Sequence, residues 1–201
     1  MLKIDFSHKA CNLDISNLCF LECPKCMRVL WSDKKTIPGG IMTIERFAKI
    51  VNYFRYIHFC GQISDPIFNP NLITFLSMCK NADKGSTVHT AASQRPVSWY
   101  EKAFDANSDT RWIFGVDGLP DESCMYRINQ DGEKLFEVMK MGVKKGLKID
   151  WQYIVFSYNE DHIEETHNMA KENGIEFIVN YSGRWTSEQD PYKPRNPKFS
   201  T

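Results

Sequence analysis

The chain has 201 residues, which is long enough for one domain with a substantial buried core. Its 25 lysines and arginines balance 25 aspartates and glutamates, so the overall charge favours neither nucleic acid nor an anionic membrane as a partner. The amino-terminal segment lacks the apolar run of a signal peptide, and no stretch approaches the roughly 20 apolar residues of a membrane-spanning helix. We therefore expect a cytoplasmic protein that binds no nucleic acid and enters no membrane.

Short runs rich in β-branched or aromatic residues alternate with amphipathic segments between residues 12 and 180. The expected strands, in chain order, are Asn12–Ser16, Ile57–Cys60, Ser86–Thr90, Trp112–Val116, Ile149–Phe156 and Ile175–Val179. Strands that alternate with helices favour parallel βαβ units. Because six strands are too few for a closed eight-stranded barrel, we predict an α/β fold, a partial (β/α)6 TIM-like barrel, with a doubly wound open sheet as the alternative.

The helices between these strands are indicated by apolar residues at helical spacing and by residues typical of helix ends. In chain order, Thr43 caps a helix from Ile44 to Phe54, Asn69-Pro70 opens a second, Pro96–Phe104 forms a third, a fourth runs from Leu135 to about Gly146, and Asn159 caps a fifth that ends at Gly174. Residues 181–201 are polar and contain three prolines. We expect a barrel domain at residues 1–180 and a tail at residues 181–201 that is disordered or covers the barrel mouth as a lid.

Seven cysteines are an odd number in a chain that lacks the loop-rich pattern of a small secreted scaffold, so reduced thiols with a metal or cluster role fit better than disulfides. Cys19, Cys23 and Cys26 form a C-x3-C-x2-C triplet just after the first expected strand. Three thiolates so close in sequence can hold a [4Fe–4S] cluster and leave one iron open. The alternatives are chance spacing or a zinc site completed by Cys11, but Cys11 precedes the strand and would lie roughly 15 Å from the loop.

The segment that contains the triplet, DISNLCFLECPKCMR, resembles the opening of the radical S-adenosylmethionine (SAM) superfamily, and closely its SPASM-type peptide-modifying branch. The resemblance continues through FCGQISDP, FGVDGL, MYR and WQYIVFSYNED, so it covers roughly residues 11–180. It implies a [4Fe–4S] cluster and SAM as cofactors. The open iron would bind the amino and carboxylate groups of SAM, and the reduced cluster would cleave SAM to a 5′-deoxyadenosyl radical that abstracts hydrogen from a substrate.

The resemblance also implies partners. A flavodoxin- or ferredoxin-like protein would reduce the cluster, and the branch implies a peptide substrate. A small-molecule substrate, as in nucleobase or cofactor biosynthesis, is the enzymatic alternative. A non-catalytic scaffold protein that binds zinc or an inert cluster is the alternative from another class.

The sequence departs from the family pattern in four places. Lys25 stands before the third cysteine, where an aromatic residue is frequent, and Cys60-Gly61-Gln62 replaces the familiar Gly-Gly-Glu. The third expected strand ends in Thr-Ala-Ala-Ser, where the similar branch often has Thr-Asn-Gly. No cysteine follows Cys124, so we expect a single cluster and no SPASM extension with auxiliary clusters.

Functional residues of (β/α) barrels gather on the loops that follow the carboxyl ends of the strands, and polar loops follow the expected strands here. In the loop after the second strand, Gly61 lets the backbone approach a ligand closely. By resemblance, Gly61 and Gln62 would bind the methionine ammonium of SAM, together with Asp65. Asp65 could instead only shape the turn at Asp65-Pro66.

Three further residues are expected to contact SAM or substrate. Arg127 presents a fork of donors that matches a carboxylate, and the resemblance implies that it binds the SAM carboxylate; a solvated surface arginine is the alternative. Asp117 would accept hydrogen bonds from the ribose hydroxyls or only shape the Asp-Gly turn. Gln152 and Tyr153 alternate along the fifth strand, so only one of them can face the barrel interior.

For two other residues, the sequence does not decide whether they take part in the chemistry. Cys124 lies on the expected rim of the site, and His89 near the end of the third strand could act as an acid or base. A buried thiol and a satisfied core or rim histidine are the simpler interpretations.

Overall fold

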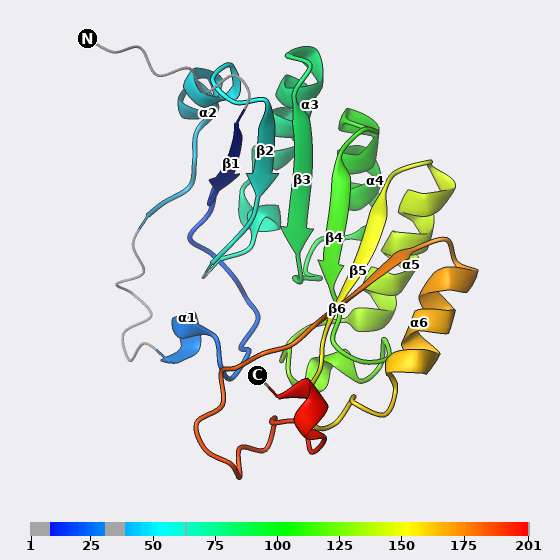
Figure 1. Cartoon of the computed structure of the whole chain (residues 1–201). Coiled ribbons are helices and arrows are strands. Elements are labelled where there is room, and N and C mark those ends of the chain that lie inside the picture. Colours follow the sequence, from blue (N-terminus) through cyan, green and yellow to red (C-terminus); the bar gives the residue numbers. More distant parts are fainter. Residues whose placement is uncertain (1–8, 31–38, 63, 201) are drawn as a thin grey trace.

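The computed structural model describes residues 9–30, 39–62 and 64–200 (Figure 1). Residues 1–8 of the expected domain, Ile63 of the loop after the second strand and Thr201 of the tail therefore lie outside the described residues. The strands are β1 (Ala10–Leu13), β2 (Tyr56–Phe59), β3 (Gly85–Thr90), β4 (Arg111–Gly115), β5 (Ile149–Ile154) and β6 (Glu176–Asn180). The α-helices are α1 (Met27–Leu30), α2 (Ile44–Val51), α3 (Leu72–Asn81), α4 (Val97–Ala106), α5 (Gly132–Lys144) and α6 (Ile163–Glu172), and short 3-10 helices are η2 (Pro66–Phe68), η3 (Ser123–Met125) and η4 (Pro197–Phe199).

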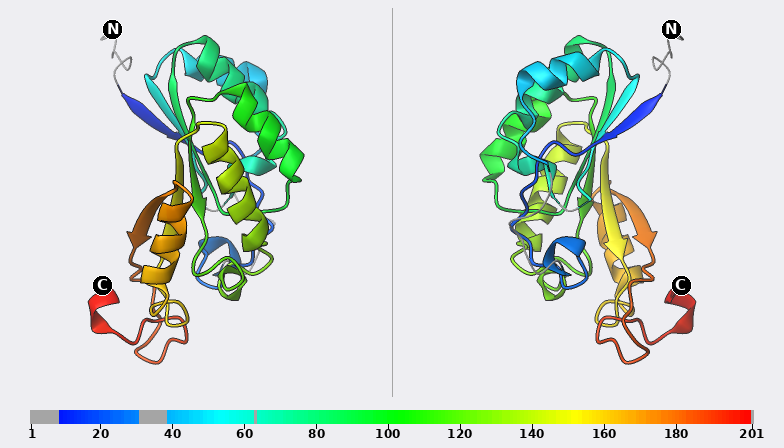
Figure 2. Two further views of the ribbon diagram at one scale, coloured as in Figure 1. Left: turned by 90° about the vertical axis from the view of Figure 1, so that its right-hand side faces the viewer. Right: turned by 90° about the vertical axis from the view of Figure 1, so that its left-hand side faces the viewer.

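The six strands form one parallel sheet in the order β1-β2-β3-β4-β5-β6. Each crossover leads to the next strand in the same direction, so the helices lie along one face of the sheet (Figure 2). A doubly wound sheet would reverse its strand order near the middle and place helices on both faces. The predicted partial (β/α)6 barrel is therefore confirmed, as a curved, open sheet whose edges are β1 and β6.

The hydrophobic core lies between the sheet and this layer of helices. Alternate strand residues point into the core, among them the fully buried Phe59, Trp112 and Trp151. Trp112 contacts Phe104 of α4, and Trp151 contacts Phe136 of α5. Burial of one such side chain stabilises the fold by about 2–3 kcal/mol. The intervening strand residues, which point away from the core, face the open concave side of the sheet.

The first strand lies earlier in the chain than expected. It covers Ala10–Leu13, where it pairs with β2 from Tyr56 onward, and Asp14 then accepts a hydrogen bond from the backbone N–H of Gln62 (3.2 Å). Cys11 therefore lies within the strand, and the expectation that it precedes the strand is wrong. The register with β2 decides this, because strand ends depend on the partner strand as well as on local sequence.

The predicted helix cap at Thr43 is confirmed, whereas the predicted caps at Asn69 and Asn159 are wrong. The Thr43 side chain accepts a hydrogen bond from the backbone N–H of Arg46 (3.3 Å). Asn69 is fully buried and donates to the carbonyl oxygens of Ile15 (2.6 Å) and Met42 (3.1 Å), which ties the segments after β1 and before α2 to the loop after β2. The helix α3 consequently begins only at Leu72.

Asn159 also does not cap a helix, because its side chain organises the turn before it. Its side chain accepts from the backbone N–H of Phe156 (2.7 Å) and donates to the carbonyl of Ile154 (3.0 Å), so it closes the turn after β5 instead of capping α6. That helix begins at Ile163. Asparagine amides serve turns as readily as helix caps, and the sequence alone does not distinguish the two.

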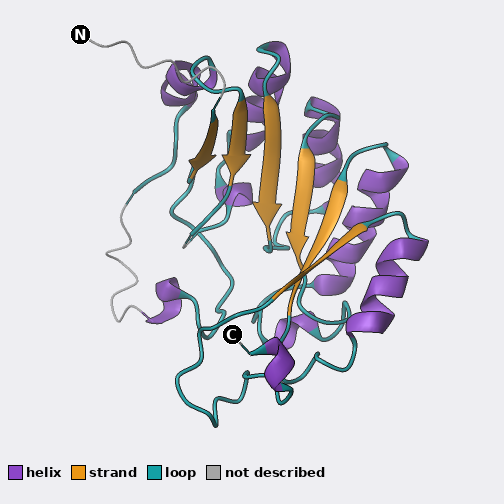
Figure 3. Cartoon of the chain, in the orientation of Figure 1, coloured by secondary structure: helices purple, strands orange, loops and turns teal. Residues whose placement is uncertain are grey.

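The tail packs against the carboxyl ends of the strands (Figure 3). Residues 181–200 return along the loop between β5 and α6, where the backbone N–H of Ser157 donates to the carbonyl of Tyr192 (3.1 Å). Farther along, Arg195 pairs with the buried carboxylate of Glu160 (2.5 Å). None of the helices in the described residues is both long enough and apolar enough to span a membrane.

Candidate active site

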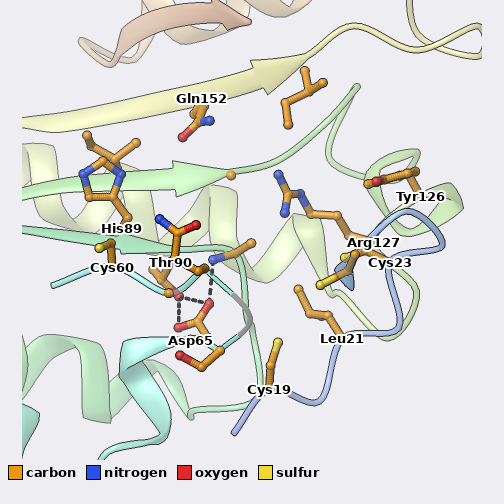
Figure 4. Close-up of a pocket in the computed structure, with 18 of the residues that line it drawn as sticks. Cys19, Leu21, Cys23, Cys60, Asp65, His89, Thr90, Tyr126, Arg127 and Gln152 are labelled. Atoms are coloured by element: carbon orange, nitrogen blue, oxygen red, sulfur yellow. Dashed lines mark hydrogen bonds between the residues drawn. The ribbon is translucent and has the colours of Figure 1, made fainter. Parts of the chain in front are cut away.

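A cavity of about 380 Å³ opens at the carboxyl ends of the strands (Figure 4). This size is within the range of sites that bind small molecules. The cavity brings together most of the residues expected from the sequence, namely Cys19, Cys23, Cys26, Gly61, Gln62, Asp65, Arg127 and Gln152. Asp117 is the one expected site residue that does not line it.

The loop with the three cysteines is held by backbone contacts to neighbouring loops. The backbone N–H of Glu22 donates to the carbonyl of Ile128 (3.1 Å), and that of Asp65 donates to the carbonyl of Leu18 (2.9 Å). Between the second and third cysteines, the N–H of Cys26 donates to the carbonyl of Cys23 (3.0 Å), and α1 begins directly afterwards. The loop therefore has a defined shape that places three thiols at one cavity.

The thiols of this loop are reduced and partly buried. Burial raises the pKa of Cys19 to about 12, and the nearby Asp65 carboxylate adds to the rise. Burial also raises the pKa of Cys23 to about 11, although the adjacent Arg127 guanidinium acts in the opposite direction. Thiols with these pKa values are protonated at neutral pH, so they would release their protons on binding a metal.

The chemistry of the donor set fits an iron–sulfur cluster. Within residues 9–30, 39–62 and 64–200, no three His, Cys, Asp or Glu side chains are arranged to hold one ion. A cluster ligates each thiolate through a different iron, so its cysteines need only surround a common space. Cys19, Cys23 and Cys26 meet that requirement, whereas Cys11 in β1 does not line the cavity.

Asp65 joins the loop after β2 to the end of β3 (Figure 4). Its buried carboxylate accepts from the Thr90 hydroxyl (2.8 Å) and from the backbone N–H groups of Ile67 (3.1 Å), Ala91 (2.9 Å) and Ala92 (3.0 Å). Both oxygens are thus occupied by groups of the chain itself. This geometry is compatible with the alternative in which Asp65 shapes the turn at Asp65-Pro66, since its side chain accepts from the N–H of Ile67 at the start of η2.

Arg127 and Asp117 form a buried ion pair behind the cysteine loop. Arg127 Nε lies 2.7 Å from Asp117 Oδ2, and the other oxygen of Asp117 accepts from the backbone N–H of Ile154 (2.9 Å). Burial by itself would lower the pKa of Arg127, but the Asp117 carboxylate raises it above its usual value, so the guanidinium stays charged. Arg127 faces the cavity beside Cys23 (Figure 4). Asp117 does not line the cavity, and its ion pair holds the arginine in place.

Two glycines give the cavity its shape. A Cβ at Gly61 would lie 1.9 Å from the carbonyl oxygen of Ser64, so only glycine allows the loop after β2 to fold back on itself. A Cβ at Gly115 would lie 2.9 Å from the Arg127 guanidinium, so glycine leaves room for that side chain at the end of β4. The hydroxyl of Ser64 is buried at the cavity and has no hydrogen-bond partner among the described residues, which leaves it available to a ligand.

The concave face of the sheet contributes polar side chains to the cavity. Gln152 points into it, whereas Tyr153 points to the other face and donates its hydroxyl to the carbonyl of Asn159 (2.5 Å). His89 also lines the cavity; burial lowers its pKa, and the neighbouring His58 and Arg111 lower it further. The His89 imidazole is therefore neutral at physiological pH.

Cys124 lies outside the cavity. Its thiol is exposed and donates to the carbonyl of Asp121 (3.4 Å), so the expected place on the rim does not bring it to the site.

Several residues that line the cavity were not among the candidate site residues, including Cys60, Ser64, Tyr126 and Arg184. Cys60 and Ser64 belong to the same loop as Gly61, and Tyr126 directly precedes Arg127 in the sequence. Arg184 follows β6 in the tail, and the rule that functional residues follow strand ends places it among the expected polar loops, although it was not assigned a contact. No periodic pattern distinguishes these residues, because their position depends on how the loops converge.

The tail is anchored to the cysteine loop by Lys25. Lys25 Nζ lies 2.5 Å from Asp190 Oδ2, and the Asp190 carboxylate also accepts from the backbone N–H groups of Thr186 (3.0 Å) and Tyr192 (3.1 Å). Burial by itself would raise the pKa of Asp190, but these donors hold it well below its usual range. The residue that departs from the family pattern at position 25 thus connects the tail to the loop between two cysteines.

We expect Asp190→Asn to release the tail, because the amide cannot replace a buried carboxylate that accepts from an ammonium and two backbone N–H groups. Limited proteolysis should cleave residues 181–200 of the variant several-fold faster than those of the wild type. The control is Glu188→Gln, which removes an exposed ion pair with Lys193 in the same tail (2.6 Å) and should change little. Equal cleavage rates for the two variants would contradict the anchoring role.

Among known proteins, similarity to this chain is found in solved structures and not in sequences. No protein-family model and no curated protein sequence matches the chain. Among solved structures, SuiB of Streptococcus suis is similar at 16% identity and a TM-score of 0.71, over 96% of this chain and 43% of SuiB. The structure of anSMEcpe with bound AdoMet is similar at 18% identity and a TM-score of 0.67, over 94% of this chain and 56% of that one.

A third similar structure is methylornithine synthase (PylB), at 12% identity and a TM-score of 0.61, over 87% of this chain and 54% of that one. This chain spans about half the length of these three proteins. All three are radical SAM enzymes, and each matches nearly the whole of the described sheet and helices. The chain therefore has the fold of the radical SAM enzymes, which its cysteine triplet first indicated.

Proposed function

We propose that this chain is a radical SAM enzyme in which Cys19, Cys23 and Cys26 hold a single [4Fe–4S] cluster. The observation that carries the proposal is the convergence of these three thiols on one cavity that also presents Arg127, the loop at Gly61 and Gln152. When bound, such a cluster supplies the electron that cleaves SAM to methionine and a 5′-deoxyadenosyl radical, which then abstracts hydrogen from the substrate. SAM-bound structures of SuiB and anSMEcpe support the assignment of this cofactor.

The residues of the chain would bind and orient SAM. Arg127 faces the cavity as a permanent cation, and its donors suit the SAM carboxylate. The loop at Gly61 and Gln62, with the unpartnered Ser64 hydroxyl, would accept hydrogen bonds from the SAM ammonium. Asp65 and Asp117 act as positioning residues, since one shapes the wall and the other holds Arg127. The ribose role expected for Asp117 is not part of this proposal, because Asp117 does not line the cavity.

We further propose that residues 1–180 form the catalytic domain and that residues 181–201 serve as a lid. The tail supports this by placing Arg184 at the cavity and by its anchor at Lys25. A lid would exclude water from the radical, which would otherwise react with groups other than the substrate.

A peptide is the substrate class that we favour. SuiB has been solved bound to the precursor peptide SuiA, and anSMEcpe with the Kp18Cys peptide. A small-molecule substrate is the second candidate, which the similarity to methylornithine synthase favours. A flavodoxin- or ferredoxin-like reductant would supply the electron in either case.

Anaerobic reconstitution with iron and sulfide tests the proposal. We expect a brown protein with about four irons per chain that forms 5′-deoxyadenosine from SAM when dithionite is added. A colourless protein that retains one tightly bound zinc would contradict it and would favour the scaffold alternative.

Cysteine variants test which residues hold the cluster. We expect Cys23→Ala to lose the visible absorption of the cluster and to abolish 5′-deoxyadenosine formation, because it removes one of the three thiols that the loop presents to the cavity. Cys124→Ala, at an exposed cysteine outside the cavity, and Cys79→Ala, at a core cysteine, should retain both. Equal loss of iron in all three variants would show that the ligands are assigned wrongly.

A further inference from the structure

The tail contacts two segments that line the cavity, the cysteine loop and the segment that precedes α5. Lys25 of the cysteine loop pairs with Asp190 of the tail, and the two side chains are only 13% and 0% exposed. On the other side, the Tyr192 ring packs edge-on against Tyr126, with 5.3 Å between the ring centroids. Tyr126 lines the cavity directly before Arg127. One turn of the tail therefore links the cysteine loop to the segment that carries Arg127.

This turn of the tail is built around Asp190. Its carboxylate accepts from the backbone N–H groups of Thr186 (3.0 Å) and Tyr192 (3.1 Å) and from the Thr186 hydroxyl (2.8 Å). The N–H of Asp190 donates to the carbonyl of Ser187 (3.2 Å). The same carboxylate thus organises residues 186–192 and holds Lys25. If Lys25 moves away, a buried carboxylate loses the ammonium that faces it, which is unfavourable.

Lys25 lies between two of the proposed cluster ligands, Cys23 and Cys26. The backbone turns at Pro24 and Lys25, and the N–H of Cys26 donates to the carbonyl of Cys23 (3.0 Å). A cluster ligated by both thiolates fixes the two ends of this turn, and with them the backbone at Lys25. A contact made to a segment that is already ordered costs less entropy, which gives positive cooperativity between the two events. Cluster binding and docking of the tail therefore favour one another.

We infer that the tail responds to the state of the cluster: the bound cluster stabilises the docked tail, and the docked tail helps to retain the cluster. The two effects belong together, because a coupling free energy between two sites acts in both directions. The inference rests on the proposed function for the identity of the cluster, and it adds a regulation of the lid to that function. Lys25 and Asp190 are positioning residues here, since neither lines the cavity.

Hydrogen exchange of the full chain, measured anaerobically with and without the reconstituted cluster, tests the inference. We expect the cluster to slow exchange of the Thr186 and Tyr192 amides, which the Asp190 carboxylate binds, by about fivefold or more. The amides of α6 serve as an internal reference and should exchange equally in both states. Cys23→Ala, treated with iron and sulfide in the same way, should show no slowing. Equal exchange of residues 186–192 in the two states of the wild type would overturn the inference.

Variants assign the effect to the buried ion pair. Asp190→Asn and Lys25→Gln should each remove the slowing, because either change breaks the pair between the tail and the cysteine loop. The control is Glu188→Gln, which removes an ion pair with Lys193 in the same turn at a glutamate side chain that is 83% exposed, and it should keep the slowing. Exchange at the wild-type rate in α6 identifies each variant as folded. A loss in Glu188→Gln as large as in Asp190→Asn would contradict the assigned pair.

Retention of iron measures the coupling from the other side. During anaerobic incubation with a chelator of ferrous iron, Asp190→Asn should lose iron several-fold faster than the wild type, and Glu188→Gln should lose it at the wild-type rate. This measurement requires neither SAM nor turnover. A wild type that assembles no cluster would overturn both the proposed function and the inference. A wild type that assembles the cluster and cleaves SAM, but whose tail exchanges equally with and without the cluster, would overturn the inference alone.

Discussion

Replacement of Arg127 by methionine is expected to lower the free energy of unfolding by about 3–5 kcal/mol, because it leaves the buried Asp117 carboxylate without its partner. The Asp117 side chain is fully buried, and the ion pair measures 2.7 Å. Urea denaturation monitored by circular dichroism measures the change. The same variant should bind SAM more weakly, since it removes the cation from the cofactor cavity.

Two further variants separate this effect from a general loss of charge. Lys140→Met removes the partner of Glu137 on α5, where the glutamate side chain is 65% exposed, and should cost about 1 kcal/mol or less. The double variant Arg127→Met with Asp117→Leu should recover much of the stability, because apolar residues can replace a buried ion pair. A loss for Arg127→Met no greater than that for Lys140→Met would contradict the importance of the buried pair.

Asp65→Ala is expected to destabilise the chain by at least about 3 kcal/mol, because it removes the acceptor for three backbone N–H groups and one hydroxyl. The effect should be largest at the end of β3, where hydrogen exchange of the Ala91 and Ala92 amides should accelerate most. The matched control is Asp14→Ala, in the adjacent loop, which removes a single acceptor at Gln62 and should cost about 1 kcal/mol. Uniform acceleration of exchange over the whole sheet in Asp65→Ala would contradict a local role.

These two predictions concern aspartates for which the sequence left two roles open, contact with SAM or the shaping of a turn. In the structure, Asp65 and Asp117 are each buried and bound to groups of the chain itself. An aspartate after a strand is equally suited to bind a ligand or to organise neighbouring backbone. The choice depends on which N–H groups and cations lie within reach, and these come from β3, β5 and the loop after β4.

The alternation of strands and helices was predictable because local patterns produce it. Apolar residues at a spacing of two or of three to four determine whether a segment can bury one face as a strand or as a helix. The cluster-binding role of the cysteine triplet could also be proposed from the sequence, because the three cysteines are close together along the chain and one loop can carry them. The element ends at Asn69 and Asn159 were not predictable. The Asn69 amide is bound by partners distant in sequence, and the Asn159 amide closes the preceding turn, which a helix-cap pattern does not distinguish from a cap.

The sequence by itself determined the class of fold, the loop that carries the cysteines and eight of the residues that line the cavity. Only the tertiary structure decided that the sheet is ordered consecutively and open, that Gln152 and not Tyr153 faces the cavity, and that Asp117 lies behind Arg127. It also decided that the tail reaches the site through Lys25 and Arg184. The physical reason is that periodicity and motifs encode contacts between near neighbours, whereas these features arise from loops that are distant in sequence and converge at the carboxyl ends of parallel strands.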